Sequence, residues 1–250
     1  ELYLDDNFEI ENYIIKGKAK EISATISKKI NLKNTNFNFF VDPLDILIKD
    51  IYSEAEGLKI KNGNLRIDKS KNITVESDFN TEIDITKRNI GKYLPFVKDF
   101  NNINDESLLK AELGHILNIN FDKTLKVINY NYTNKGKAEK IALKFNEPLE
   151  NVILEENINE LNLLNSVLNT RYSSDKKNFV VANGEYQFNK DKTQNYKFKN
   201  NFRKDKMNID LDLKFSYPFN IDLINYKQKV NEVGDISLNL TFNKDSINFK

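Results

Sequence analysis

The stretch Met207-Asn208-Ile209-Asp210-Leu211-Asp212-Leu213-Lys214-Phe215 alternates strictly between apolar and polar residues. Successive side chains of a β-strand point to opposite faces, so this order gives one apolar face and one polar face. In a helix the same order would spread the apolar groups around the whole circumference. The stretch therefore predicts a β-strand with a single apolar face.

The same alternation recurs along most of the chain. The other segments that show it are residues 73–85, 109–121, 58–60, 65–67, 141–145 and 236–242. The run from Asn72 to Ile85 is about 14 residues long, whereas most strands have five or six residues. Ser77 and Thr81 lie on its apolar side, where small polar residues indicate a bend or thin packing. We expect long strands that follow one another in sequence.

Turn residues separate these segments. Asn62-Gly63 predicts a two-residue hairpin turn, because a type I′ turn needs positive φ at both central residues. Residues 68–72, 134–136 and 189–192 predict further turns. Strands joined by short turns form an antiparallel meander.

Two segments break the alternation. Residues 89–98 predict a short helix or a loop, because Pro95 disfavours a central strand. Residues 156–170 fit a strand or a short helix, because Ile158, Leu161 and Leu164 have near-helical spacing while Leu161 and Leu163 also suit a strand.

We expect an all-β protein with at most one or two short helices. Its long antiparallel β-meander would be curled into an elongated, "β-taco"-like groove, because no clear helices are available to cover the apolar face. A β-sandwich is the alternative. Residues 1–250 read as one β-groove segment of a longer protein, since the chain begins at Glu1 and ends in a strand-like pattern. An internal break, if one exists, falls near residues 86–105.

Composition excludes several classes of protein. An aromatic content of 11% argues against disorder, and a net charge of +1 argues against a duplex-binding domain. The absence of cysteine excludes disulfides and thiolate metal sites. No apolar run approaches the length of a membrane-spanning helix.

Candidate catalytic residues have simpler structural interpretations. His115 is the single histidine, and it shares a face with Leu113 and Leu117, so we expect a structural role. Asp210 and Asp212 lie on the polar side of a regular strand and are interpreted as solvated charges. The chain contains no phosphate-binding glycine loop, and residues 68–72 and 189–193 lack the ligand pattern of a calcium loop. We expect no enzymatic activity, no cofactor and no metal.

Lysines and aromatic residues alternate at Asn195-Tyr196-Lys197-Phe198-Lys199. The alternation places Tyr196 and Phe198 opposite to the lysines, so the rings point inward. A binding face for single-stranded nucleic acid would present both kinds of side chain together. We therefore expect no nucleic-acid partner.

The continuous apolar face is the candidate working surface, because a concave and incompletely filled apolar face can accept acyl chains. The residues that we expect to face a lipid are Ile73, Val75, Phe79, Leu109, Leu113, Leu117, Ile119, Ile209, Leu211, Leu213, Phe215, Leu238, Leu240 and Phe242.

The succession of short and long strands at residues 36–40, 46–51, 57–68 and 73–85 resembles the repeating region of the AsmA-like superfamily, in particular its YhdP- and TamB-type members. The resemblance implies a bridge-like lipid transfer protein, anchored in the inner membrane of Gram-negative bacteria and extending through the periplasm. It implies that phospholipid is the partner, bound or conducted between the inner and outer membranes, and that this segment lies in the periplasm. Membrane contact would be made by regions outside the segment.

Two other functions stay open from the residues alone. A structural or adhesive β-sandwich or solenoid module of a surface protein would have a filled interior and no trough. A carbohydrate-active enzyme would need acidic and aromatic residues clustered in a cleft, and the sequence does not indicate such a cluster.

Overall fold

The computed structural model describes residues 1–4, 6, 10–26, 30–93, 99–149, 157–203, 206–221, 226–229, 232–243 and 246–249. These residues form seventeen strands and one helix. The elements up to the helix are β1 (Leu2–Leu4), β2 (Ile10–Tyr13), β3 (Ile15–Ile26), β4 (Ile30–Val41), β5 (Asp45–Ala55), β6 (Leu58–Asp68), β7 (Ile73–Thr86) and α1 (Lys87–Tyr93). The later elements are β8 (Leu108–Phe121), β9 (Val127–Leu149), β10 (Ile158–Ser173), β11 (Asn178–Phe188), β12 (Gln194–Arg203), β13 (Lys206–Phe215), β14 (Phe219–Ile221), β15 (Tyr226–Gln228), β16 (Gly234–Asn243) and β17 (Ser246–Phe249).

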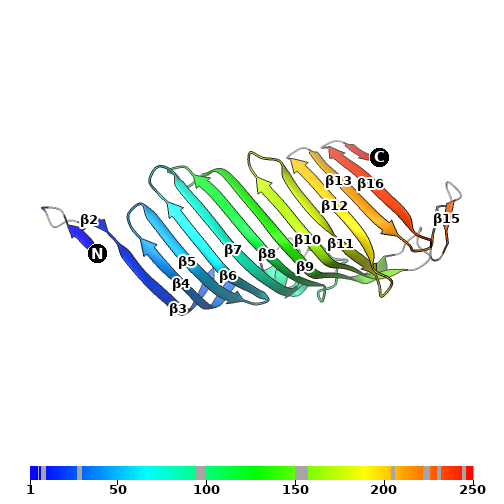
Figure 1. Ribbon diagram of the computed structural model, residues 1–250, viewed down its shortest axis with the longest axis horizontal. Coiled ribbons are helices and arrows are strands. Elements are labelled where there is room, and N and C mark those ends of the chain that lie inside the picture. The colour runs from blue at the N-terminus through cyan, green and yellow to red at the C-terminus, as the bar shows by residue number, and fades with distance from the viewer. Residues whose placement is uncertain are drawn as a thin grey trace. The chain divides into compact units, whose positions relative to one another are not determined.

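Thirteen strands form one sheet, in which hydrogen-bonded neighbours follow the chain from β3 to β13 and then β16 and β17 (Figure 1). The pairs β1–β2 and β14–β15 form two separate hairpins. The pairs with a described register are antiparallel. The expected all-β antiparallel meander with one short helix is thus confirmed. The described strands contain no second large sheet of the kind that a sandwich needs.

Contacts along the chain divide it into two compact units. Unit 1 comprises Glu1–Ile83, Glu112–Lys135 and Arg171–Lys176. Unit 2 comprises Asp84–Ala111, Gly136–Thr170 and Lys177–Lys250. Each unit is described by itself below.

Most strands lie where the alternation predicts them. β7 has 14 residues and β13 covers the whole stretch from Met207 to Phe215. The predicted turns at 68–72 and 189–192 separate β6 from β7 and β11 from β12. Helix α1 occupies the start of the segment predicted as a helix or loop, and residues 94–98 lie outside the described residues. The ambiguous segment 156–170 is a strand, β10, from Ile158 onward.

Two predicted turns are wrong. Asn62-Gly63 lies inside the continuous strand β6, and residues 134–136 lie inside β9. Asn62 does adopt a positive φ of 52°, but the pairing of β6 with β7 shifts at this point instead of reversing direction. Positive φ occurs both in type I′ turns and in some β-bulges, in which one strand carries an extra residue.

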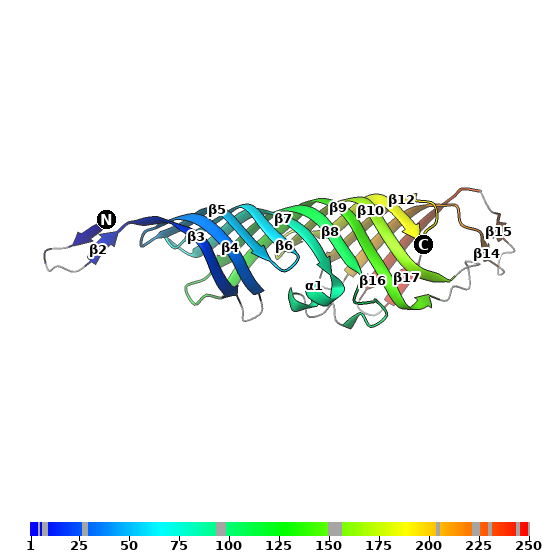
Figure 2. The ribbon, with the colours of Figure 1, turned by 90° about the horizontal axis from the view of Figure 1, so that it is seen from below.

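Bulges recur in neighbouring strands of unit 1. Glu21, Asn34, Asp50 and Asn62 have positive φ in β3, β4, β5 and β6. The pairings β3–β4, β4–β5, β5–β6 and β6–β7 all contain register shifts. Bulges bend the strand that carries them. The strands β3 and β4 are visibly bent along their length in Figure 2.

The bulge in β6 gives a first prediction. Asn62→Gly is expected to raise the free energy of unfolding slightly, and Asn62→Val to lower it by about 1–2 kcal/mol, because a branched side chain is disfavoured at positive φ. Urea denaturation of the three proteins measures both changes. A valine variant as stable as the wild type would contradict the bulge.

Large side chains contribute little to the buried interior. Among the described residues, half of the buried apolar residues are alanines, and the largest side chains that are fully buried are Ser53 and Ser166. The chain exposes 16955 Å². Two separate compact domains of half its mass would together expose only about 14,000 Å². The chain therefore exposes more surface than two compact domains of this size would.

Candidate functional site

The apolar face of unit 1 is built from rows of side chains that cross the strands. One row joins directly paired residues from β3 to β7, in the order Ile15, Val41, Ile46, Ile67 and Val75. Paired residues of an antiparallel sheet point to the same face. Ile15, at the end of the row, is 53% exposed, and the other members are half-buried. The row is therefore an apolar strip that no other described layer seals from solvent.

The apolar face of unit 2 has the same construction. Ala182, Phe198, Leu211 and Leu238 are consecutive partners across β11, β12, β13 and β16. Leu238 is 37% exposed, and Phe198 and Leu211 are half-buried. A second pair, Ile209 and Leu240, extends the strip along β13 and β16.

The fourteen residues expected to face a lipid differ in their burial. Phe215 is buried, Leu238 is exposed, and the other twelve are half-buried. Phe79 is stacked on His115, with ring centroids 4.6 Å apart, so another side chain already covers part of it. The sequence did not single out Val41, Ile46 and Phe198 as members of the rows, because the rows depend on the register between strands.

His115 forms the centre of a hydrogen-bonded cluster in unit 1. Its Nε2 lies 2.8 Å from Thr81 Oγ1, and its Nδ1 lies 2.7 Å from Tyr132 Oη. The side chain is 8% exposed and stacks between the rings of Phe79 and Tyr132. Both ring nitrogens are engaged by hydroxyl groups, which accounts for a polar ring on an apolar face.

Burial lowers the pKa of His115 below its usual value of 6.5, because the charged form loses hydration. Between the folded and unfolded pKa values, unfolding takes up a proton, so the free energy of unfolding falls as the pH drops below 6.5. The slope contributed by this group is at most about 1.4 kcal/mol per pH unit.

This prediction can be checked by NMR, since the signal of the single histidine is assigned without further work. The imidazole should titrate below pH 6.5, and His115→Gln should flatten the stability profile between pH 5 and 6.5. Carboxylates with lowered pKa, such as Asp68 and Glu82, lose their contribution only at lower pH. An imidazole that titrates above 6.5 would contradict the burial.

Aromatic side chains fill one part of the apolar face of unit 2. The ring centroids of Phe188 and Tyr217 are 5.2 Å apart, and those of Phe215 and Tyr217 are 5.4 Å apart. Tyr186 donates a hydrogen bond of 2.8 Å to the carbonyl oxygen of Lys214. Burial raises the pKa of Tyr186 well above its usual value, so the phenol stays protonated as a donor. In this part of unit 2, aromatic side chains pack over the sheet, so the apolar face is not open.

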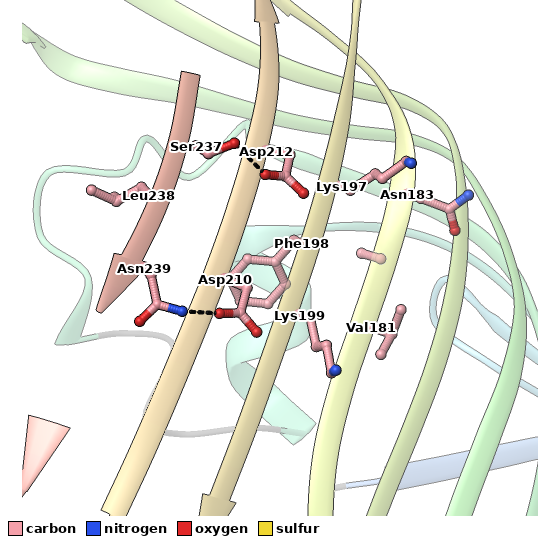
Figure 3. A pocket seen from close by; sticks show the side chains of 11 residues that line it. Val181, Asn183, Lys197, Phe198, Lys199, Asp210, Asp212, Ser237, Leu238 and Asn239 are labelled. Carbon is pink, nitrogen blue, oxygen red and sulfur yellow. Dashed lines mark hydrogen bonds between the residues drawn. The ribbon is translucent and has the colours of Figure 1, made fainter. Parts of the chain in front are cut away.

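An open hollow of about 1030 Å³ is lined by residues of β11, β12, β13 and β16 in unit 2 (Figure 3). Asp212 accepts a hydrogen bond of 2.7 Å from Ser237, and Asp210 accepts one from Asn239. The residues that line the hollow are Val181, Ala182, Asn183, Lys197, Phe198, Lys199, Asp210, Asp212, Ser237, Leu238 and Asn239. The two carboxylates lie directly across from Lys199 and Lys197 in the register of β12 and β13, which is the pattern of a solvated charged face.

Tyr196 and Phe198 are more buried than Lys197 and Lys199, as the alternation predicts. Within the described residues, no group of three or more His, Cys, Asp or Glu side chains is arranged to hold a metal ion. None of the helical residues described forms a segment long and apolar enough to cross a bilayer.

Comparisons with protein-family models, curated proteins and solved structures give no match.

Proposed function

We propose that this chain is a β-groove segment of the AsmA-like type, which binds or conducts the acyl chains of phospholipids on its apolar face. The observation that carries the proposal is the set of cross-strand apolar rows that stay half-exposed, such as Phe198, Leu211 and Leu238. A monomeric soluble protein rarely leaves a large contiguous apolar surface open unless that surface binds something.

Acyl chains fit this surface for two physical reasons. The rows offer apolar contact over several strands without directional polar groups, and hydrocarbon needs burial but no hydrogen bonds. In unit 1, one polar cluster on the same face is already paired internally, because His115 is hydrogen-bonded to Thr81 and Tyr132. An acyl chain that covers this cluster leaves its hydrogen bonds intact.

The rhythm of the strands supports the choice of family. It resembles the repeating region of AsmA-like proteins, which implies a periplasmic segment of a protein anchored in the inner membrane and a role in supplying phospholipid to the outer membrane. In this proposal the segment is non-catalytic. The lipid is held by contact with the apolar face, and no covalent step is required.

Lipid analysis of the purified protein tests the proposal. Purification without detergent, followed by organic extraction and mass spectrometry, should recover phospholipid in amounts comparable to the protein. A protein that never carries phospholipid, even in its full-length form, would refute the proposal and favour a structural or adhesive β-module. In that case the apolar rows should be covered by another protein layer.

A further inference from the structure

Among the described residues, no strand pairs with the outer edge of β3. β3 is the terminal strand of the large sheet and is hydrogen-bonded to β4 alone (Figure 1). It has twelve residues, whereas protected edge strands are commonly short. From Ile15 to Lys20 the strand is regular, before Glu21 adopts a φ of 53°. Six residues of strand give an edge of roughly 20 Å, whose outward backbone groups pair with no strand in the described part of the chain.

Three lysines mark this edge. Lys16, Lys18 and Lys20 occupy alternate positions, so they share one face, and all three are exposed. Lys16 and Lys18 lie across from Phe40 and Asn38 of β4, neither of which is acidic. Among the described residues, no ion pair includes any of the three.

The basic strand β6 within the same unit shows the contrasting arrangement. Lys59 and Arg66 are directly paired with Glu82 and Glu76 of β7. Lys61 also forms an ion pair with Glu82. β6 is therefore placed beside an acidic strand, whereas no described strand lies on the outer side of β3.

The apolar face at the same edge is also exposed. Ile15 ends its row at the edge with half of its surface exposed. Beside it lies a hollow of about 660 Å³ in unit 1, most of whose lining residues are apolar. The lining residues are Glu1, Leu2, Tyr13, Ile14, Ile15, Lys16 and Val41. An apolar side chain on an added strand would continue the row into this hollow.

We infer that the open edge of β3 binds an extended acidic segment as an additional β-strand, with Asp or Glu at alternate positions facing Lys16, Lys18 and Lys20 and apolar residues facing Ile15. The backbone ladder supplies affinity, and the charges select the partner. Edge lysines are known to discourage pairing with other strands. An acidic strand is the kind of partner that they attract instead.

A charge-swap experiment tests the inference. The probe is a fluorescent synthetic peptide with the sequence of residues 73–86, whose charged residues are Glu76, Asp78, Glu82 and Asp84. The control peptide carries lysine at those four positions. Fluorescence anisotropy at low ionic strength should show that the 250-residue chain binds the acidic peptide at least about tenfold more tightly, and that added salt weakens binding.

Variants of the chain complete the test. Combining Lys16→Glu, Lys18→Glu and Lys20→Glu should reverse the preference in favour of the lysine peptide. The matched control combines Lys190→Glu, Lys197→Glu and Lys199→Glu, which makes the same change in net charge, and it should keep the original preference.

A third peptide distinguishes pairing through backbone hydrogen bonds from electrostatic attraction alone. The acidic peptide with methyl groups on alternate backbone nitrogens cannot donate the ladder hydrogen bonds, and it should bind at least about tenfold more weakly. The inference is overturned if the acidic peptide binds no better than the lysine peptide. It is also overturned if the β3 triple variant keeps the wild-type preference for the acidic peptide. A methylated peptide that binds as tightly as the unmethylated acidic peptide would overturn it as well.

Discussion

Replacing Leu238 with aspartate is expected to weaken binding of a phospholipid to this chain by at least tenfold. Leu238 ends the row formed with Phe198 and Leu211, and it is already 37% exposed. A carboxylate at this position would lose its hydration under an acyl chain, which costs several kcal/mol, and tenfold in affinity corresponds to about 1.4 kcal/mol. Binding of a fluorescent phospholipid measures the effect.

The neighbouring residue provides the control. Ser237 lies on the opposite face of the same strand and is exposed, so Ser237→Lys introduces a full charge on the polar face, where it lies across from Asp212. That variant should bind lipid like the wild type. Circular dichroism should show both variants folded, because neither position is buried. Equal loss of lipid binding in the two variants would contradict an acyl-binding apolar face.

Gly184→Val is expected to lower the free energy of unfolding by about 2–3 kcal/mol, the cost of overpacking a site that cannot relax. A Cβ atom at Gly184 would lie 2.8 Å from both the carbonyl oxygen of Leu164 and the Cα of Ser166. Both are backbone atoms, so neither can rotate away. Tyr196 also donates a hydrogen bond of 2.7 Å to Ser166, which fixes the ring beside the glycine.

The matched control for Gly184 is the residue before it. Asn183→Val introduces the same side chain on the exposed polar face of β11 and should change stability by no more than about 0.5 kcal/mol. Urea denaturation of both variants gives the comparison. If the two substitutions have similar effects, the close approach of β10 to Gly184 is wrong.

Alternation predicted the strands well because it reports which face each side chain takes, and this holds for any regular strand. Met207 to Phe215 shows the strength of the signal, since the whole stretch is β13. The alternation also placed Thr81 on the apolar side of its strand, and the side chain is buried there, although a bend or thin packing was expected. Its partner, His115, lies 34 residues away, and no local pattern identifies such a pair.

Bulges account for the parts that the sequence did not reveal. The ambiguous segment 156–170 contains Asn165, which has a positive φ of 50° inside β10. An extra residue at a bulge changes the face taken by every later side chain, so Leu161, Leu163 and Leu168 all pack on one cluster despite their uneven spacing. That spacing resembles a helical period. A bulge also explains why Asn62-Gly63 was taken for a turn, because Asn62 has the positive φ that a type I′ turn needs.

The cross-strand rows depend on these bulges as well. Each register shift decides which residue of one strand lies beside which residue of the next, as Ile51 lies beside Gly63. A single sequence does not specify such shifts, so the apolar face was predictable but its rows were not. At the bulge in β3, the backbone N–H of Glu21 donates a hydrogen bond of 3.0 Å to the Asn36 side chain of β4, which links the two strands.

The central claim, that acyl chains lie on the apolar face, is tested most directly by photo-crosslinking. A diacyl phospholipid with a diazirine near the end of one acyl chain is bound to the chain and irradiated, and the modified residues are mapped by mass spectrometry. The proposal predicts crosslinks at Phe198, Leu211 and Leu240, which share the apolar face of unit 2. Crosslinks confined to the opposite face, at Lys197 or Asn239, or no crosslinks at all, would contradict it.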